Sequence, residues 1–125
     1  MKNLSKLTLV LGLIAGCAGP TGTTGRGAEV VSCTAGLQVN VACGALGLGS
    51  CSGDPTLRVC DAALAPDPLS CAAGMAQLGF NDDYAPPNRC PGVMVTCPAS
   101  GRISVLPGVF SGVPNCNWVA SMPGI

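Results

Sequence analysis

The amino-acid sequence predicts an all-β fold, a small antiparallel β-sandwich stapled by disulfide bonds. Residues 37–41 and 56–60 alternate apolar and polar side chains, the pattern of strands that bury one face. The 125 residues include 18 glycines and 11 prolines, which are typical of turns between short strands. The 9 cysteines are many for a chain of this length and are typical of a small exported domain. No stretch shows a convincing helical period.

Further strands are expected from the same alternation, at 10- to 20-residue spacings that favour an antiparallel sandwich. They cover residues 75–80, 93–97, 102–106 and, more weakly, 118–120. A tight turn is expected at residues 98–101, where a proline comes early and a glycine late. The expected loops are residues 42–53, 62–70 and 81–88, with an otherwise irregular end at 107–125. Residues 72–78 could instead form one or two helical turns, because alanine and methionine favour helix.

The first 17 residues carry the pattern of an export signal. Lys2 and Lys6 make a basic start, and residues 7–14 form an apolar run of eight. That run is long enough for a secretory signal and too short for a transmembrane helix, which needs about 20 apolar residues. Residues 13–17, Leu-Ile-Ala-Gly-Cys, resemble the lipobox of bacterial lipoproteins. The alternative is an ordinary signal peptide beside an accidental Cys17.

The lipobox resemblance implies that residues 1–16 are removed as a signal peptide and that Cys17 is lipidated. Lipobox cysteines carry a diacylglycerol and often a further acyl chain such as palmitate, and two or more chains hold a protein firmly in a membrane. We therefore expect a secreted-pathway protein of the cell envelope whose partner is membrane lipid. Ala18 stands where Asp would resemble an inner-membrane retention signal, which favours the outer membrane in a Gram-negative host. Residues 17–28 are expected to be the lipidated cysteine and a flexible tether, and residues 29–125 the domain.

Charge and composition exclude several classes of function. Without residues 1–16 the chain has four arginines, six acidic residues and no lysine, a net charge of −2. Nucleic-acid binding is not expected, because no basic patch can neutralise phosphates. The chain has no histidine, so a Ser-His-Asp or Cys-His catalytic arrangement is impossible. Two carboxylates can act as acid and base in glycosidases. The adjacent residues Asp82 and Asp83 do not suit that role, because neighbouring side chains in a strand point apart. We therefore expect a protein that is not an enzyme.

Eight cysteines remain once Cys17 is set aside, an even number that indicates four disulfide bonds. Zinc is the alternative, but it favours paired C-x₂₋₄-C spacings, and the shortest gap here is from Cys90 to Cys97. Cys43–Cys51 and Cys60–Cys71 are the preferred pairs, because each would close a short loop beside a strand. The pairing of the other four is left open. The eight are Cys33, Cys43, Cys51, Cys60, Cys71, Cys90, Cys97 and Cys116.

Two further sites are candidates for ligands. Asn81, Asp82 and Asp83 are the densest group of oxygen ligands, and Asp54 and Asp61 lie beside a strand that could neighbour them. Calcium is the possible ion, since it takes six to eight oxygen ligands; otherwise no cofactor is expected. The alternative is an Asx turn, in which these oxygens accept backbone N–H groups.

The large aromatic side chains offer one candidate ligand contact. Tyr84 lies in a polar loop rich in proline, where an exposed ring could contact a ligand. Trp118 follows Cys116 by two residues, so we expect it in the core, packed on that disulfide.

Four short segments resemble the bacterial pre-peptidase C-terminal domain, a small jelly-roll-like sandwich. They are residues 35–41, 53–59, 81–83 and 100–105, and they follow that family's progression of G-x-x-V-x-V, D-x-x-L-x-V, N-D-D and S-G-x-Y-x-V, with Ile103 at the aromatic position. The family's domains accompany secreted proteases without being catalytic. The resemblance implies a lipid-anchored accessory module that contacts a glycan or a protein. The alternative is a structural envelope component with no small ligand.

Overall fold

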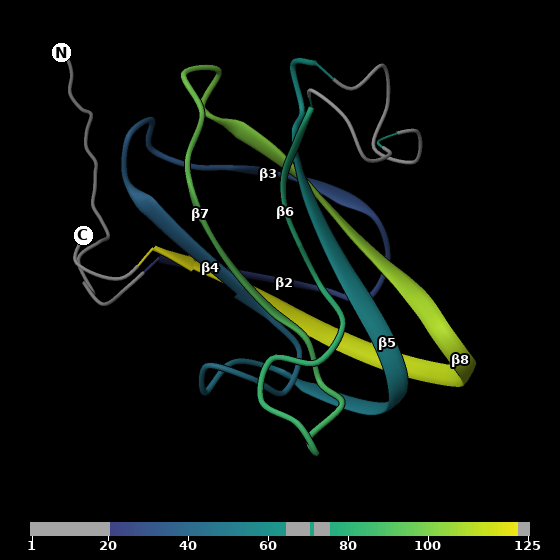
Figure 1. The fold of residues 1–125 in the computed structure, drawn as a ribbon. Helices are drawn as coiled ribbons and strands as arrows, with labels where there is room; N and C mark the ends of the chain where they lie inside the picture. Colours follow the sequence, from purple (N-terminus) through teal and green to yellow (C-terminus); the bar gives the residue numbers. More distant parts are fainter. Residues whose placement is uncertain (1–20, 65–70, 72–75, 123–125) are drawn as a thin grey trace, which may run out of the picture.

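The computed structural model describes residues 21–64, 71 and 76–122, which form antiparallel strands joined by turns (Figure 1). The described residues form no helix, and so they contain no helix long and apolar enough to cross a membrane. The predicted all-β, antiparallel and disulfide-stapled fold is confirmed. The strands are β2 Thr21–Gly25, β3 Glu29–Ser32, β4 Gln38–Ala42, β5 Ser50–Asp61, β6 Gln77–Asn81, β7 Gly92–Thr96 and β8 Arg102–Met122.

Strand β8 pairs with four other strands. The hydrogen-bonded order is β6-β5-β8-β4-β7, and β2 and β3 also pair with β8. The first part of β8 pairs with β3 and with the second half of β5. Its last part, from Trp118 to Met122, pairs with β2 and β4. One strand of 21 residues therefore belongs to both layers of the molecule.

The two layers meet where β8 turns a corner, at the lower right of Figure 1. Gly112 has a φ of 73° there, and Gly53 on the partner strand β5 also has a φ of 73°. The β5–β8 register shifts on both sides of Asp54, so the bend is made by irregular pairing. Strands that switch sheets at bulges or bends are a known way to make the corner of a sandwich.

The opposite edges, β6 and β7, close the sandwich through side-chain packing. Gly79 of β6 lies against β7, where an added Cβ would come within 2.6 Å of Val93 Cγ1 and 3.1 Å of Val95 Cγ1. Only a glycine permits so close an approach without displacement of the neighbour. The antiparallel sheet is therefore nearly closed on itself.

The core lies between the layers and follows the predicted alternation. Trp118 is fully buried, as expected of a core residue, and its indole Nε1–H donates to the carbonyl of Gly27 at 3.0 Å. Most of its neighbours are branched aliphatic side chains from alternate strand positions, which suit a pleated surface. The largest of these are Val39, Val41, Leu57, Val59, Ile103 and Val105.

Four disulfide bonds join all eight expected cysteines: Cys33–Cys97, Cys43–Cys116, Cys51–Cys90 and Cys60–Cys71. The predicted Cys60–Cys71 pair is confirmed, and the predicted Cys43–Cys51 pair is wrong. The loop between Cys43 and Cys51 is closed by backbone instead, because Gly44 N–H donates to the Leu48 carbonyl at 2.7 Å. Cys43 is fully buried and reaches across to β8, with 5.4 Å between the Cα atoms of Cys43 and Cys116.

The strands predicted from alternation are confirmed as β4, β5, β6, β7 and the start of β8. The expected turn at residues 98–101 is present, with Gly101 N–H donating to the Pro98 carbonyl at 2.9 Å. The alternative of one or two helical turns at 72–78 is wrong for residues 77 and 78, which lie in β6; residues 72–75 lie outside the described part. The predicted loop at 62–70 is described only to residue 64, which is a turn. The export signal and Cys17 also lie outside the described residues.

Three segments expected to be irregular are strands. Residues 50–53, the end of the expected loop at 42–53, begin β5. Residues 107–117 continue β8. Because the strand turns the corner here, its side chains do not alternate regularly between buried and exposed positions. Residues 21–25, expected to be tether, form β2 and pair with β8 from Gly25–Trp118 to Thr21–Met122. A Cβ at Gly25 would overlap the Trp118 ring, with Cε2 only 2.8 Å away. The small residue at this position is required for close packing and is not a sign of a flexible tether.

A substitution that adds one methyl group can test the packing of β2 on Trp118. We expect Gly25→Ala to destabilise the fold by about 1–3 kcal/mol, the usual cost of overpacking, and to lower the melting temperature by at least about 4 °C. Gly27→Ala is the matched control, because nothing lies within 4 Å of a Cβ at that position. Thermal unfolding followed by circular dichroism measures both. Equal melting temperatures for the two variants would contradict the assignment of β2 to the domain.

The disulfides should differ in what they contribute to stability. Cys43–Cys116 spans 73 residues and Cys60–Cys71 spans 11. Because the longer loop loses more entropy on closure, we expect replacement of Cys43 and Cys116 by alanine to cost about 1–2 kcal/mol more than replacement of Cys60 and Cys71. Urea denaturation of the two double variants measures the difference. A larger loss from Cys60 and Cys71 would contradict this reasoning.

Candidate metal centre

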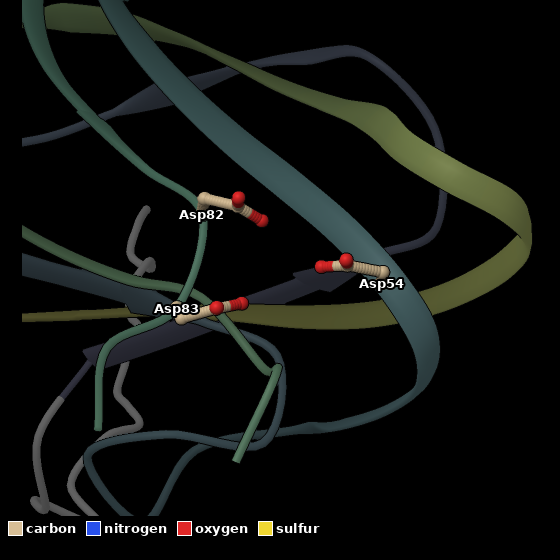
Figure 2. Close-up of side chains that lie close together, drawn as sticks. All are labelled: Asp54, Asp82 and Asp83. Carbon is tan, nitrogen blue, oxygen red and sulfur yellow. The ribbon is translucent and has the colours of Figure 1, made fainter. Parts of the chain in front are cut away.

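Asp54 is an acidic side chain buried at the corner of the sandwich (Figure 2). It lies on β5 at the point where the pairing with β8 is irregular, opposite Ser111. Asp54 is only 4% exposed, and the next residue, Pro55, is fully buried. A buried carboxylate is costly unless it is paired or binds a metal, so its partners decide what the site can do.

Asp82 and Asp83 reach Asp54 because β6 pairs with β5. The last residue of β6, Asn81, is opposite Leu57, and the chain continues toward the corner end of β5. Asn81 itself faces the backbone, where its Oδ1 accepts from the Gly92 N–H at 3.1 Å. This bond is not the local Asx turn of the alternative, because Gly92 lies 11 residues further along the chain. It leaves the two aspartates as the acidic groups that approach β5.

One carboxylate oxygen from each of Asp54, Asp82 and Asp83 lies within 4.8 Å of the other two. Figure 2 shows the three side chains converging from β5 and from the loop after β6. The Oδ1 atom of each is buried and has no hydrogen-bond partner. Three such acceptors facing one another without a donor are the arrangement that a cation would satisfy.

Arg89 and Ser111 supply the site's other polar contacts. Arg89 Nη1 lies 2.9 Å from Asp54 Oδ2, and the Ser111 hydroxyl donates to the same oxygen at 3.5 Å. The Arg89 side chain is 63% exposed, so its charge is screened by solvent. Three carboxylates and one guanidinium leave the group with a formal charge of −2.

The local field disfavours a third negative charge. Burial raises the pKa of Asp82, and the neighbouring carboxyl groups of Asp54 and Asp83 raise that pKa further through hydrogen bonding and charge repulsion. The carboxylates are therefore held together by the fold against their mutual repulsion.

A disulfide joins the two segments that carry the carboxylates. Cys51 lies three residues before Asp54 on β5, and Cys90 ends the loop that begins with Asp82. The same loop is closed by Tyr84 N–H, which donates to the Cys90 carbonyl at 3.2 Å. The spacing between Asp54 and the aspartate pair is thus fixed at both ends of the loop.

The structure brings together part of the site expected from sequence. Asp54, Asp82 and Asp83 meet, but Asp61 does not join them, because its Oδ1 accepts from the Ser100 hydroxyl at 2.8 Å and from Ala63 N–H at 3.0 Å. Tyr84 follows the aspartates in the loop and is 40% exposed. Sequence reasoning missed Arg89 and Ser111. The only signal for Arg89 was a single basic residue within an otherwise acidic and polar loop.

Comparisons of this chain with protein-family models, curated proteins and solved structures found no match.

The Arg89–Asp54 pair can be tested in metal-free buffer at neutral pH. We expect Arg89→Met to lower the stability by about 1 kcal/mol, because Asp54 stays buried and loses its charged partner while most of the guanidinium was already in solvent. Arg102→Met, an exposed arginine with no side-chain ion pair among the described residues, is the control and should have little effect. Chemical denaturation measures both variants. Equal losses of stability in the two variants would show that the Arg89–Asp54 pair does not contribute to the free energy of unfolding.

Proposed function

We propose that this chain is a non-enzymatic, lipid-anchored protein of the cell envelope that displays a small disulfide-stapled module to a protein partner. The observation that carries the proposal is the distance between two ends of the domain. One end lies close in sequence to Cys17, and the other presents exposed apolar side chains. The outer membrane is the proposed location in a Gram-negative host.

The start of β2 is the end nearest the proposed anchor. Only three residues separate Cys17 from Thr21, and they can span at most about 14 Å. Thr21 pairs with Met122, so the start of β2 lies beside the end of β8, at the left of Figure 1. A lipid on Cys17 would hold this end of the domain close to the membrane.

The β8 corner lies at the other end of the molecule (Figure 1). The chain from Met122 back to Gly112 covers ten residues, or roughly 30 Å of strand. At this corner Val109, Phe110 and Val113 are 60%, 68% and 98% exposed. Neighbouring large apolar side chains this open to solvent favour a protein contact. The three side chains offer no polar group to orient a sugar.

Several features support a function without catalysis. The chain has no histidine, and all eight cysteines of the described residues are in disulfides. The four segments that resemble the pre-peptidase C-terminal domain fall on β4, on β5, at the end of β6 and at the start of β8. That placement on four strands in chain order, with β7 between the third and the fourth, supports an accessory module of that kind. Tyr84 stays a predicted ligand contact at the acidic loop.

The proposal predicts that contact and anchoring can be separated by mutation. In cells, a photoreactive residue at position 113 should form one discrete cross-linked product in the membrane fraction, and Phe110→Ser should weaken it several-fold. A photoreactive residue at Ser100, an exposed turn residue, is the matched control and should give no such product. Cys17→Ser should move the protein from the membrane to the soluble fraction.

Two outcomes would contradict the proposal separately. Membrane retention of the Cys17→Ser protein would exclude the lipid anchor. Equal cross-linking from positions 113 and 100, unaffected by Phe110→Ser, would exclude the corner as a contact surface and favour the structural envelope component.

A further inference from the structure

We propose that Asp54, Asp82 and Asp83 bind one calcium ion, which joins β5 to the loop after β6 at the corner of the sandwich. The ion would be held by one oxygen from each carboxylate, and water and backbone carbonyls would complete its shell. This site does not depend on the proposed lipid anchor or on a partner at the corner.

Besides the clustering of three carboxylates, the proposal rests on the burial of Asp54 and on its unpartnered Oδ1 atom. Its side chain is 5% exposed, and Oδ2 has two partners while Oδ1 has none. Figure 2 shows the Asp54 carboxylate directed toward Asp82 and Asp83. Asp54 Oδ1 is buried beside the Oδ1 atoms of Asp82 and Asp83, and none of the three has a hydrogen-bond partner. Because an unsatisfied buried charge is expensive, the fold gains from a cation at this point.

Size and charge both favour calcium. Oxygens on opposite sides of one calcium ion are about 4.6–5.2 Å apart, and those on opposite sides of magnesium about 4.0–4.2 Å apart. The three carboxylate oxygens lie within 4.8 Å of one another, a separation that the larger calcium ion can bridge. The formal charge of −2, after the Arg89 guanidinium is counted, matches a divalent ion.

The bound ion would act on the corner itself. Asp54 accepts from Ser111, which lies on β8 next to the exposed Phe110. The acidic loop is tied to β5 through Cys51–Cys90. An ion at the carboxylates would thus link three segments whose backbone pairing is irregular or absent. Without the ion, like charges repel at the same point.

Thermal unfolding of the purified full chain, with 5 mM calcium and with a chelator, tests the site. We expect calcium to raise the melting temperature by at least about 4 °C, the shift for a site with a dissociation constant of about 10⁻⁴–10⁻³ M. Asp82→Asn should melt at or above the wild-type temperature in chelator, because a like charge is removed. In calcium it should lose most of the gain, so the order of the two proteins reverses.

Asp61→Asn is the matched control, since Asp61 is an acidic residue of a neighbouring turn that does not reach the site. It should keep the whole calcium response.

Terbium, which replaces calcium in such sites, gives a second readout that does not depend on stability. Tyr84, next to Asp83, should sensitise terbium luminescence, and calcium should displace the terbium. No calcium shift in the wild type, an equal shift in Asp82→Asn, or an equal response to magnesium would overturn the assignment.

Discussion

The fold depends on the pairing of a single strand. Strand β8 gives hydrogen bonds to β2, β3, β4 and β5, so it supplies one strand to each layer and the connection between them. A strand that serves both layers must turn, and the turn cannot keep regular pairing with its neighbour. The irregular pairing of Asp54 with Ser111 follows from that requirement. The topology alone therefore requires the corner, and any function of the corner is a separate matter.

The disulfides compensate for a core with few large side chains. Trp118 is the only aromatic residue among the buried core side chains of the described part, and half of the other residues in the core cluster are valines. Such a core buries little area per residue, and the many glycines leave a large conformational entropy to overcome. Three of the four disulfides close loops of 39 to 73 residues and tie different strands together. They lower the conformational entropy of the unfolded chain and so add to the stability that the apolar core supplies.

Sequence reasoning located most strands and failed where packing or a corner overrides local pattern. Alternation was sufficient for residues 37–41, because one face of β4 meets the core. Residues 21–25 were missed, because small polar residues in a tether and in an edge strand against Trp118 have the same composition. The Cys43–Cys51 prediction failed because sequence proximity ignores that Cys43 points into the core. Asp82 and Asp83 were predictable from their density, whereas Arg89 and Ser111 meet them only through the topology.

The acidic group and the exposed apolar side chains share one physical origin. Where β5 and β8 bend, their backbones cannot complete a regular ladder, and side chains at the bend cannot all alternate between core and solvent. Asp54 points inward at that bend while Phe110 and Val113 point outward. The opposite end of the molecule, where β2 meets the end of β8, keeps regular register through five successive pairs. The irregular corner is therefore where side chains can leave the core-and-solvent alternation at least cost to the rest of the fold.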